Sequence, residues 1–322
     1  MSAKTITSAA SGRLGANLGL LATTAAWGTM IPVLNLLLPR WDGFFLAAAR
    51  YGLALPFLLA ALKLREPGRL LPAGVAPWRV LVLGAIGIGA FAPLFTVGVA
   101  HANPITAAIL SASGPVIALF VAWLVDRAPV DRRLVPGIAL VVIGGAIATV
   151  DFRAGGRLFD LRGGEPLMLL ASFCWTWASL TAQRWLAGCS QLRIATLLLL
   201  PGVAVLFLVD LAAIPVGLAH WPPAMRGAFD GALFLWMGLV SVLAGLMLWN
   251  HGVRVLGVVV ASFFLNLIPI AAVLITALLG TLPTGWQLAG GALVLGGVMQ
   301  AQRHRPAGPR HQAAASSRRG AS

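Results

Sequence analysis

Apolar stretches of about twenty residues alternate with short polar or turn-forming segments along most of the chain. A transmembrane helix needs roughly 20 consecutive apolar residues, because the hydrocarbon core of a bilayer is about 30 Å thick. The pattern predicts spanning helices at residues 18–38, 43–62, 78–100, 104–125, 133–150, 165–185, 192–212, 231–252, 257–280 and 284–302. We therefore expect an all-α integral membrane protein with ten transmembrane helices.

The first helix and the helix boundaries carry further signals. Residues 18–38 form an apolar stretch longer than the roughly 7–15 residues of a signal-peptide core, so a retained helix is expected. Asn103 and Pro104 resemble a helix N-cap followed by proline at the first helical position. The predicted loops are short, which favours antiparallel neighbouring helices.

The chain also contains an internal repeat. Residues 81–137 align without a gap to residues 235–291, and 13 of the 57 aligned positions are identical. About five identities would be expected by chance for so biased a composition. The shared residues include glycines and prolines, which fix backbone geometry: Gly84/Gly238, Gly98/Gly252, Pro115/Pro269, Pro129/Pro283 and Gly137/Gly291. Upstream, Trp27 aligns with Trp175 at an offset of 148.

Each copy of the repeat spans five predicted helices. Because five is an odd number, the second copy must enter the membrane from the opposite side, and inverted repeats of this kind are common in secondary transporters. Convergent apolar composition is the alternative explanation. The expected division is a cytoplasmic N-terminus at 1–14, repeat 1 at 15–150, an external linker at 151–164, repeat 2 at 165–302 and a basic, disordered cytoplasmic tail at 303–322.

Charge and composition agree with a membrane location. The sequence is 59% hydrophobic and only 10% charged, whereas soluble domains are about one quarter charged. With both termini in the cytoplasm, 17 of the 23 Lys and Arg residues fall on cytoplasmic segments, as the positive-inside rule requires. We expect a multi-pass protein of the plasma membrane, the inner membrane of a bacterium.

The same charge pattern bears on the expected partners. The net charge of +14 follows from topology, so the lipid bilayer and a small-molecule solute are the expected partners and nucleic acid is not. The sequence leaves the oligomeric state open and is compatible with a homodimer. Cys174 and Cys189 suggest neither a disulfide framework nor a metal site.

Several short motifs, in their order along the chain, resemble the EamA form of the drug/metabolite transporter superfamily. They are Ala26-Trp27-Gly28-Thr29 with Pro32, Ala49-Arg50-Tyr51, the stretch 84–107 with Leu110 and Pro115, Leu248-Trp249-Asn250-His251-Gly252, and the stretch 261–269. The resemblance covers about residues 15–302. It implies a plasma-membrane exporter or facilitator of small metabolites with a central cavity between its halves. The second half has no clear counterpart of Arg50.

Arg50 is the one strong base inside a predicted span, about 10 Å deep at 1.5 Å per residue. It is a candidate anion contact or gate on the outer side. The alternatives are snorkelling to the outer interface and hydrogen bonding to carbonyls of a neighbouring helix.

Aromatic and polar residues complete the set of candidates for a substrate cavity. Trp27, Trp175, Trp177 and Trp249 lie within predicted spans, where indole rings either line a cavity for planar or cationic solutes or serve interhelical packing. Ser111 and Asn266 also lie within spans and need partners there, from a solute or from another helix.

Two further groups have conformational interpretations. His101, Asn250 and His251 occupy near-equivalent places in the two repeats, at helix ends, and are candidate gates or interfacial capping residues. Pro32, Pro93, Pro115 and Pro269 fall within helices and are expected to kink them.

The candidate chemistry favours a transporter over an enzyme. No P-loop or H-E-x-x-H motif is present, so neither ATP hydrolysis nor a cofactor or metal is expected. All nine acidic residues lie in loops or near helix ends, which favours facilitated transport over proton antiport through a buried acid. The expected function is transport of small metabolites such as amino acids, amines or aromatic compounds by alternating access, with export as the expected direction. A lipid-processing membrane enzyme and a non-transporting scaffold are the alternatives.

Overall fold

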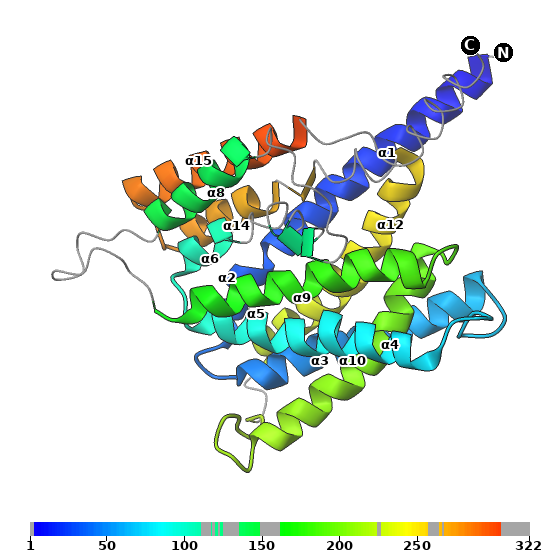
Figure 1. Ribbon diagram of the computed structural model, residues 1–322, viewed down its shortest axis with the longest axis horizontal. Coiled ribbons are helices and arrows are strands. Elements are labelled where there is room, and N and C mark those ends of the chain that lie inside the picture. The colour runs from blue at the N-terminus through cyan, green and yellow to red at the C-terminus, as the bar shows by residue number, and fades with distance from the viewer. Residues whose placement is uncertain are drawn as a thin grey trace.

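The computed structural model describes residues 3–110, 135–148, 162–223, 227–256 and 267–303, with isolated helical positions between 117 and 124 and at 264–265. All regular structure in these residues is helical, which confirms the expected all-α class. The bundle and the long N-terminal helix that extends from it are shown in Figure 1.

The first half of the chain forms eight helical elements in the described residues. Their bounds are α1 (Ala3–Gly28), α2 (Met30–Leu37), α3 (Gly43–Arg65), α4 (Pro77–Gly84), the π-helix η1 (Ala85–Ala90), α5 (Phe91–Ala100), α6 (Pro104–Leu110) and α8 (Val135–Ala148). The first helix begins well before the expected position 18, and the chain from Pro77 to Ala100 is helical throughout. Asn103 caps α6, because its side-chain oxygen accepts from the Thr106 amide at 3.4 Å.

The second half contains seven described elements. They are α9 (Gly164–Trp185), α10 (Gln191–Ala213), α11 (Ala228–Leu235), the π-helix η4 (Trp236–Ala244), α12 (Gly245–Leu256), α14 (Leu267–Leu278) and α15 (Gly285–Arg303). The expected span at 231–252 thus corresponds to three consecutive helical segments, α11, η4 and α12.

Several helical stretches are suited to a bilayer by length and composition. Within the described residues, five are long and apolar enough to cross a membrane: Arg13–Leu37, Gly43–Arg65, Pro77–Ala100, Gln191–Ala213 and Ala228–Trp249. Many large apolar side chains on these helices face outward, Leu208 at 65% exposed among them, which a water-soluble fold would disfavour. The molecule is therefore built as a multi-pass membrane protein.

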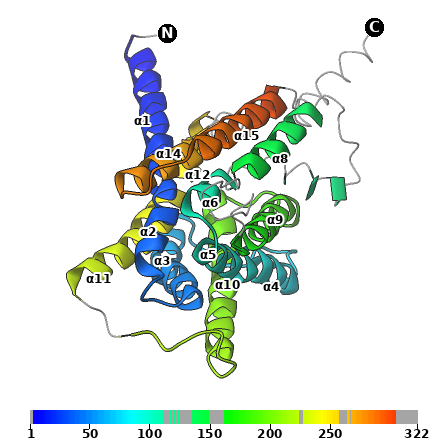
Figure 2. The same cartoon turned by 90° about the vertical axis from the view of Figure 1, so that its left-hand side faces the viewer.

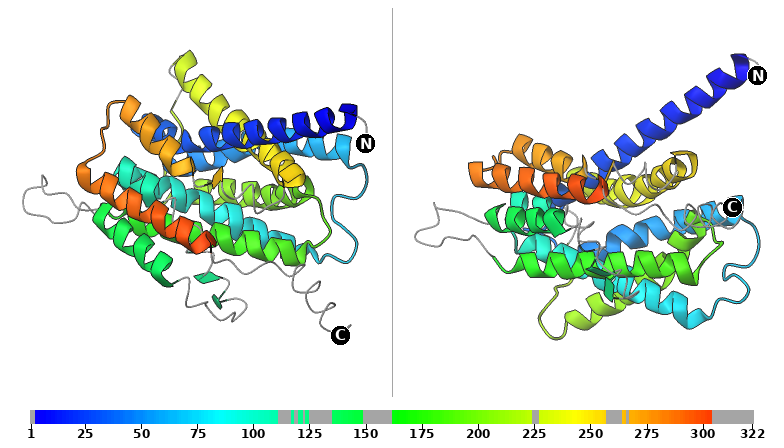
Figure 3. Two further views of the ribbon diagram at one scale, coloured as in Figure 1. Left: turned by 90° about the horizontal axis from the view of Figure 1, so that it is seen from above. Right: turned by 45° about the horizontal axis from the view of Figure 1, so that its top comes forward.

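Helices from the two halves pack against each other throughout the bundle. α5 lies along α9, α3 along α10, α1 along α12 and α8 along α15. The views in Figures 2 and 3 show the first and second halves interleaved rather than standing as separate units. One buried apolar cluster lies among α3, η1, α9 and α10, and a second surrounds α2 and the start of α3.

The helices α3 and α10 correspond residue for residue at an offset of 148. Gly43–Arg65 maps onto Gln191–Ala213, and each helix begins after a capping side chain at the matching position. The Asp42 carboxylate accepts from the Phe44 amide at 2.7 Å, and the Ser190 hydroxyl accepts from the Arg193 amide at 3.0 Å. Both residue types stabilise a helix N-terminus.

Close contacts at glycine recur with the two halves exchanged. A Cβ on Gly98 would lie 2.7 Å from the Met168 side chain, and a Cβ on Gly252 would lie 2.5 Å from the Leu20 side chain. Gly252 is 154 positions after Gly98, and Met168 is 148 positions after Leu20. Each contact therefore pairs one half with the other, and the second contact is the first with its partners swapped.

A second glycine pair follows the same rule. A Cβ on Gly84 would lie 2.5 Å from Pro201, and one on Gly238 would lie 2.7 Å from Leu53. Gly238 is the repeat equivalent of Gly84, and Pro201 is the equivalent of Leu53. This second contact also pairs aligned positions of the two halves with the partners exchanged.

The two π-helices also occupy equivalent places. Residues 85–90 of η1 map at an offset of 154 onto residues 239–244, which form the C-terminal part of η4. A π-helix breaks the regular i→i−4 hydrogen bonding, so its carbonyls become available to other donors, and such segments are frequent at functional sites. Pro93 follows η1 and supplies no amide of its own.

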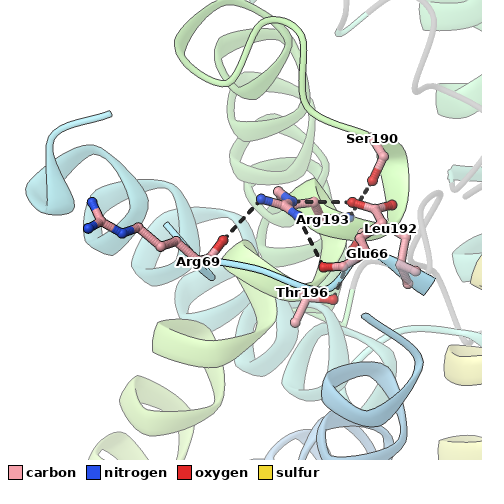
Figure 4. Close-up of polar contacts among 6 residues, drawn as sticks. All are labelled: Glu66, Arg69, Ser190, Leu192, Arg193 and Thr196. Atoms are coloured by element: carbon pink, nitrogen blue, oxygen red, sulfur yellow. Dashed lines mark hydrogen bonds and ion pairs between the residues drawn. The ribbon is translucent and has the colours of Figure 1, made fainter. Parts of the chain in front are cut away.

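Ion pairs join the halves at both ends of α3. Before its start, Arg40 Nη2 lies 2.6 Å from Asp230 Oδ1. Beyond its end, Arg193 Nε lies 3.2 Å from Glu66 Oε2, and Arg193 also donates to the Arg69 carbonyl at 3.1 Å (Figure 4). An ion pair between the first and second halves thus lies at each end of α3.

Candidate functional site

Arg50 is buried in the bundle without a carboxylate partner among the described residues. Its side chain lies on α3 and is only 2% exposed. Its Nη1 lies 3.4 Å from the Met30 sulfur, a weak acceptor, and its Nε has no hydrogen-bond partner. Burying an unpaired charge costs several kcal/mol in effective terms, so a compensating interaction is required.

Aromatic rings supply part of that compensation. The Arg50 Cζ lies 4.9 Å from the centroid of the Tyr51 ring and 5.8 Å from that of Phe95. A guanidinium near an aromatic ring gains roughly 0.5–2 kcal/mol, which offsets only part of the desolvation cost. Among the described residues, the Arg50 side chain neither reaches the surface nor donates to a backbone carbonyl. These were the two alternatives to a functional role that the sequence left open.

The Met30 contact places Arg50 beside the junction of α1 and α2 at Thr29. Thr29 keeps helical backbone angles, and its amide and carbonyl make the helical bonds Thr29 N–Ala25 O at 3.1 Å and Val33 N–Thr29 O at 2.9 Å. Pro32 has no amide hydrogen, so the Gly28 carbonyl lacks its i+4 donor. Close by, the Ala26 carbonyl accepts from the Thr29 hydroxyl at 2.6 Å and from the Ser241 hydroxyl at 3.1 Å.

Residues of the π-helix η4 make further hydrogen bonds to the α1–α2 junction. The Ser241 carbonyl accepts from Trp27 Nε1 at 2.8 Å, and Trp236 Nε1 donates to the Thr29 hydroxyl at 2.8 Å. Ser241 therefore donates through its hydroxyl and accepts through its carbonyl. These bonds join the α1–α2 junction of the first half to the π-helix of the second half.

A row of aromatic rings leads away from Arg50. Phe95 lies 5.7 Å from Phe91, and Phe91 lies 5.2 Å from Trp175, measured between ring centroids. The row runs from α5 to α9, and its last member, Trp175, is 42% exposed. Of the predicted cavity residues, Arg50 and Trp175 are thus joined through two phenylalanines.

Trp27 and Trp249 form a second aromatic pair across the halves. Their ring centroids are 5.8 Å apart, one on α1 and the other on α12. Trp175 is the repeat equivalent of Trp27, and Phe95 is that of Trp249. The row through Phe91 is therefore the counterpart of the Trp27–Trp249 pair with the halves exchanged.

Trp177 has different neighbours from Trp175. Its ring lies 6.2 Å from that of Trp185 in an edge-to-face arrangement, and Trp185 in turn contacts Trp78 at 5.2 Å. Two residues apart on an α-helix, the side chains point about 200° apart. The described contacts therefore assign Trp177 to packing near the end of α9.

Of the three gate candidates, His101 lies at a helix end and Asn250 and His251 do not. His101 follows the last residue of α5, is exposed, and has its Nδ1 3.0 Å from the Val97 carbonyl. Asn250 and His251 lie within α12, which continues to Leu256, so they are not at its end as expected. The His251 side chain is exposed.

Some of the remaining candidates cannot be placed in the fold. Ser111, Asn266 and Pro115 lie outside the described residues. Pro269 lies in the first turn of α14, where proline is tolerated, and Pro32 and Pro93 lie near the starts of α2 and α5.

Arg50 has no charged counterpart in the second half. At the offset that aligns α3 with α10, its position is occupied by Leu198, which is buried in an apolar cluster. The α1–α2 junction at Thr29 is equally one-sided, because the equivalent position, Trp177, lies inside the single helix α9. The buried charge and the helix junction therefore occur together, in one half of the described chain only.

Sequence reasoning missed several residues of this site: Thr29, Met30, Phe91, Phe95, Trp236 and Ser241. Phe95 could have been found by its alignment with Trp249 in the repeat. Ser241 aligns with Gly87 and carries no comparable signal, because its role depends on the π-helix.

Comparisons with known proteins agree with this architecture. The sequence model of the EamA-like transporter family matches residues 14–150 and 162–301. The chain is 27% identical over 263 residues to the "Uncharacterized transporter YyaM" of Bacillus subtilis, covering 79% of this chain and 83% of that protein. It is 27% identical over 305 residues to a "Probable terminal-alkyne amino-acid exporter" of Streptantibioticus cattleyicolor, covering 93% and 97%.

A solved structure shares the fold. A crystal structure superposes with a TM-score of 0.61 at 19% identity, covering 89% of this chain and 96% of the other. The family match covers almost all of the described helices. The chain belongs to the EamA-like transporter family of membrane transporters, within the drug/metabolite transporter superfamily.

Proposed function

We propose that this protein carries small metabolites across the plasma membrane of a bacterium by alternating access, with export as the working direction. The observation that carries the proposal is the exchange of contacts between the halves, seen for Gly98 with Met168 and Gly252 with Leu20. Two halves related in this way, in opposite orientations, can adopt each other's shape, so that an outward-open state becomes an inward-open one.

The site beside the α1–α2 junction is the proposed place of solute binding. Pro32 leaves a backbone carbonyl without its helical donor there, and such groups are tolerated at membrane depth where they line a cavity. Arg50, the Phe95–Phe91–Trp175 row and the Trp27–Trp249 pair lie around this junction on helices from both halves. The proposed solutes are small metabolites such as amino acids, amines and aromatic compounds.

Both termini are proposed to be cytoplasmic, with repeats at 15–150 and 165–302 joined by an external linker. On that topology the Arg40–Asp230 contact lies on the outer face and the Glu66–Arg193 contact on the inner face. Separation of the halves at one face at a time would open the site to one side of the membrane. No carboxylate of the described residues lies beside Arg50, which supports facilitated transport over antiport through an acid at the site.

Flux through purified protein in proteoliposomes tests the proposal. Radiolabelled amino acids, amines and aromatic compounds are loaded, and release is compared with that from protein-free liposomes. Transport predicts faster release of at least one solute, and lower release with Trp175→Ala. Release of every solute at the protein-free rate would contradict it.

A further inference from the structure

Arg50 stands out as a buried charge with no carboxylate partner among the described residues. It is 2% exposed, its Nε has no hydrogen-bond partner in that part of the chain, and its Nη1 lies 3.4 Å from the Met30 thioether sulfur, with the Tyr51 side chain alongside. A guanidinium carries five N–H donors in a planar fork that matches two carboxylate oxygens. The described surroundings provide no such group, so an anionic partner from outside the chain would complete the site.

Packing does not require an arginine at this position. Leu198 occupies the equivalent place on α10, a helix of the same length with a capping residue at the same position. The architecture therefore accepts a leucine where the first half carries a charge. A residue that costs stability and is not needed for packing points to a role in binding.

The neighbours of the guanidinium are suited to an apolar solute. Met30 and Phe95 are only partly buried, and the aromatic row continues through Phe91 to the exposed ring of Trp175. Methionine has a flexible side chain, so Met30 can move aside when a stronger acceptor arrives. The site thus combines one cationic head with an extended aromatic surface.

We infer that Arg50 binds the carboxylate of the transported solute, and that the site selects small organic carboxylates with an apolar or aromatic body over amines and neutral analogues. This inference rests on the proposed transport function and narrows its substrate class. A single desolvated cation attracts an anion and repels an amine, since like charges in low dielectric are strongly unfavourable. The aromatic row contributes stacking and apolar contact to the remainder of the solute.

Three probes that share a phenyl ring and a short alkyl chain test the selectivity directly: 3-phenylpropionate, 3-phenylpropanamide and 3-phenylpropylamine. Binding to the full-length protein in nanodiscs is measured by calorimetry. The expected result is a Kd for the carboxylate at least about tenfold below that for the amide and the amine. Equal binding of all three, tighter binding of the amine, or binding of none would overturn the inference.

Variants then assign the selectivity to Arg50. Arg50→Gln removes the charge and is expected to abolish the carboxylate preference, while Arg50→Lys retains part of it because a point charge lacks the planar fork. Arg65→Gln is the matched control, since Arg65 is the last residue of the same helix α3 and is exposed. Loss of the preference in Arg65→Gln, or its persistence in Arg50→Gln, would contradict the assignment. The comparison of probes on the unaltered protein keeps the test decisive if Arg50→Gln fails to fold.

Flux in proteoliposomes separates this inference from the proposed function. Release of any solute with no Arg50-dependent preference would leave transport standing and overturn the carboxylate site. Carboxylate-selective binding that depends on Arg50, with no flux of 3-phenylpropionate or any other solute, would overturn transport and leave Arg50 as a binding residue.

Discussion

The indole rings of Trp27 and Trp249 lie with their centroids 5.8 Å apart, and each has an aromatic equivalent in the other half of the chain. Those equivalents, Trp175 and Phe95, are bridged by Phe91. The second arrangement contains an extra ring and ends at Arg50, whereas the first does not contact a charge among the described residues. Aligned positions of the two halves thus form two aromatic arrangements. The one that contains Phe91 also contacts Arg50 and belongs to the candidate binding site.

The close approach of the end of α4 to α10 at Gly84 predicts a large effect of a single methyl group. Gly84→Ala would place a Cβ 2.6 Å from the Leu198 carbonyl oxygen and 3.0 Å from the Gly202 nitrogen, and backbone atoms cannot move aside cheaply. We expect a loss of about 1–3 kcal/mol, seen as a lower Tm of the purified protein. Gly296→Ala on α15, where nothing lies within 4 Å, is the control and should leave Tm unchanged or raise it.

The reciprocal bonds of Ser241 predict coupling between two substitutions. Ser241→Ala removes the donor to the Ala26 carbonyl, and Trp27→Phe removes the donor to the Ser241 carbonyl. Each should lower stability by about 0.5–1.5 kcal/mol, because each removes one hydrogen bond between the halves. Since both act on the same junction, the double variant should differ from the sum by at least about 0.5 kcal/mol in a thermal-unfolding cycle. Strict additivity would show that the two bonds act independently.

Trp175 and Trp177 form a matched pair, two residues apart on α9. Trp175→Ala removes an exposed ring from the end of the aromatic row, so solute affinity should fall by about five- to tenfold with little change in Tm. Trp177→Ala removes a ring that packs on Trp185, so Tm should fall while affinity is kept. Calorimetry and thermal unfolding on both variants check this. The reverse pattern would place the solute near Trp177 instead.

Cross-linking the two faces tests movement of the halves. Cysteine pairs that replace Arg40 and Asp230, or Glu66 and Arg193, can be joined by a cleavable bifunctional reagent. Alternating access requires the halves to part at each face in turn, so either cross-link should stop solute flux, and cleavage should restore it. Undiminished flux with both pairs fully cross-linked would rule out this motion.

Much of the helical framework could be predicted from the sequence. Apolar length alone gave the segment 43–62, which the structure extends to Gly43–Arg65, and the capping signal at Asn103 is confirmed. These features depend on local composition and on the cost of exposing backbone polar groups, so they are visible in a single segment. The Trp27 and Trp175 correspondence was equally visible, because identical residues recur at a fixed offset.

The arrangement around Arg50 could not be predicted in the same way. The sequence indicated a buried charge but not its neighbours, since Met30 and Phe95 come from other helices whose rotation is set by tertiary packing. The π-helices left no sequence mark, because a change of one residue in hydrogen-bond register alters no apolar pattern. The sequence placed Trp175 and Trp177 in one group because they lie at a similar depth in the predicted span. Two residues apart on α9, their side chains point in different directions and contact different rings.

The central claim is that the two halves enter the membrane in opposite directions, and labelling of two equivalent loop positions tests it most directly. Leu70 follows α3 and is 37% exposed, and Leu218, 148 positions later, follows α10 and is 67% exposed. Leu70→Cys and Leu218→Cys are each made after Cys174 and Cys189 are replaced by alanine, and intact cells are treated with a membrane-impermeant maleimide. The account predicts labelling of Leu218→Cys in intact cells and of Leu70→Cys only after permeabilisation. Labelling of both from the same side would contradict it.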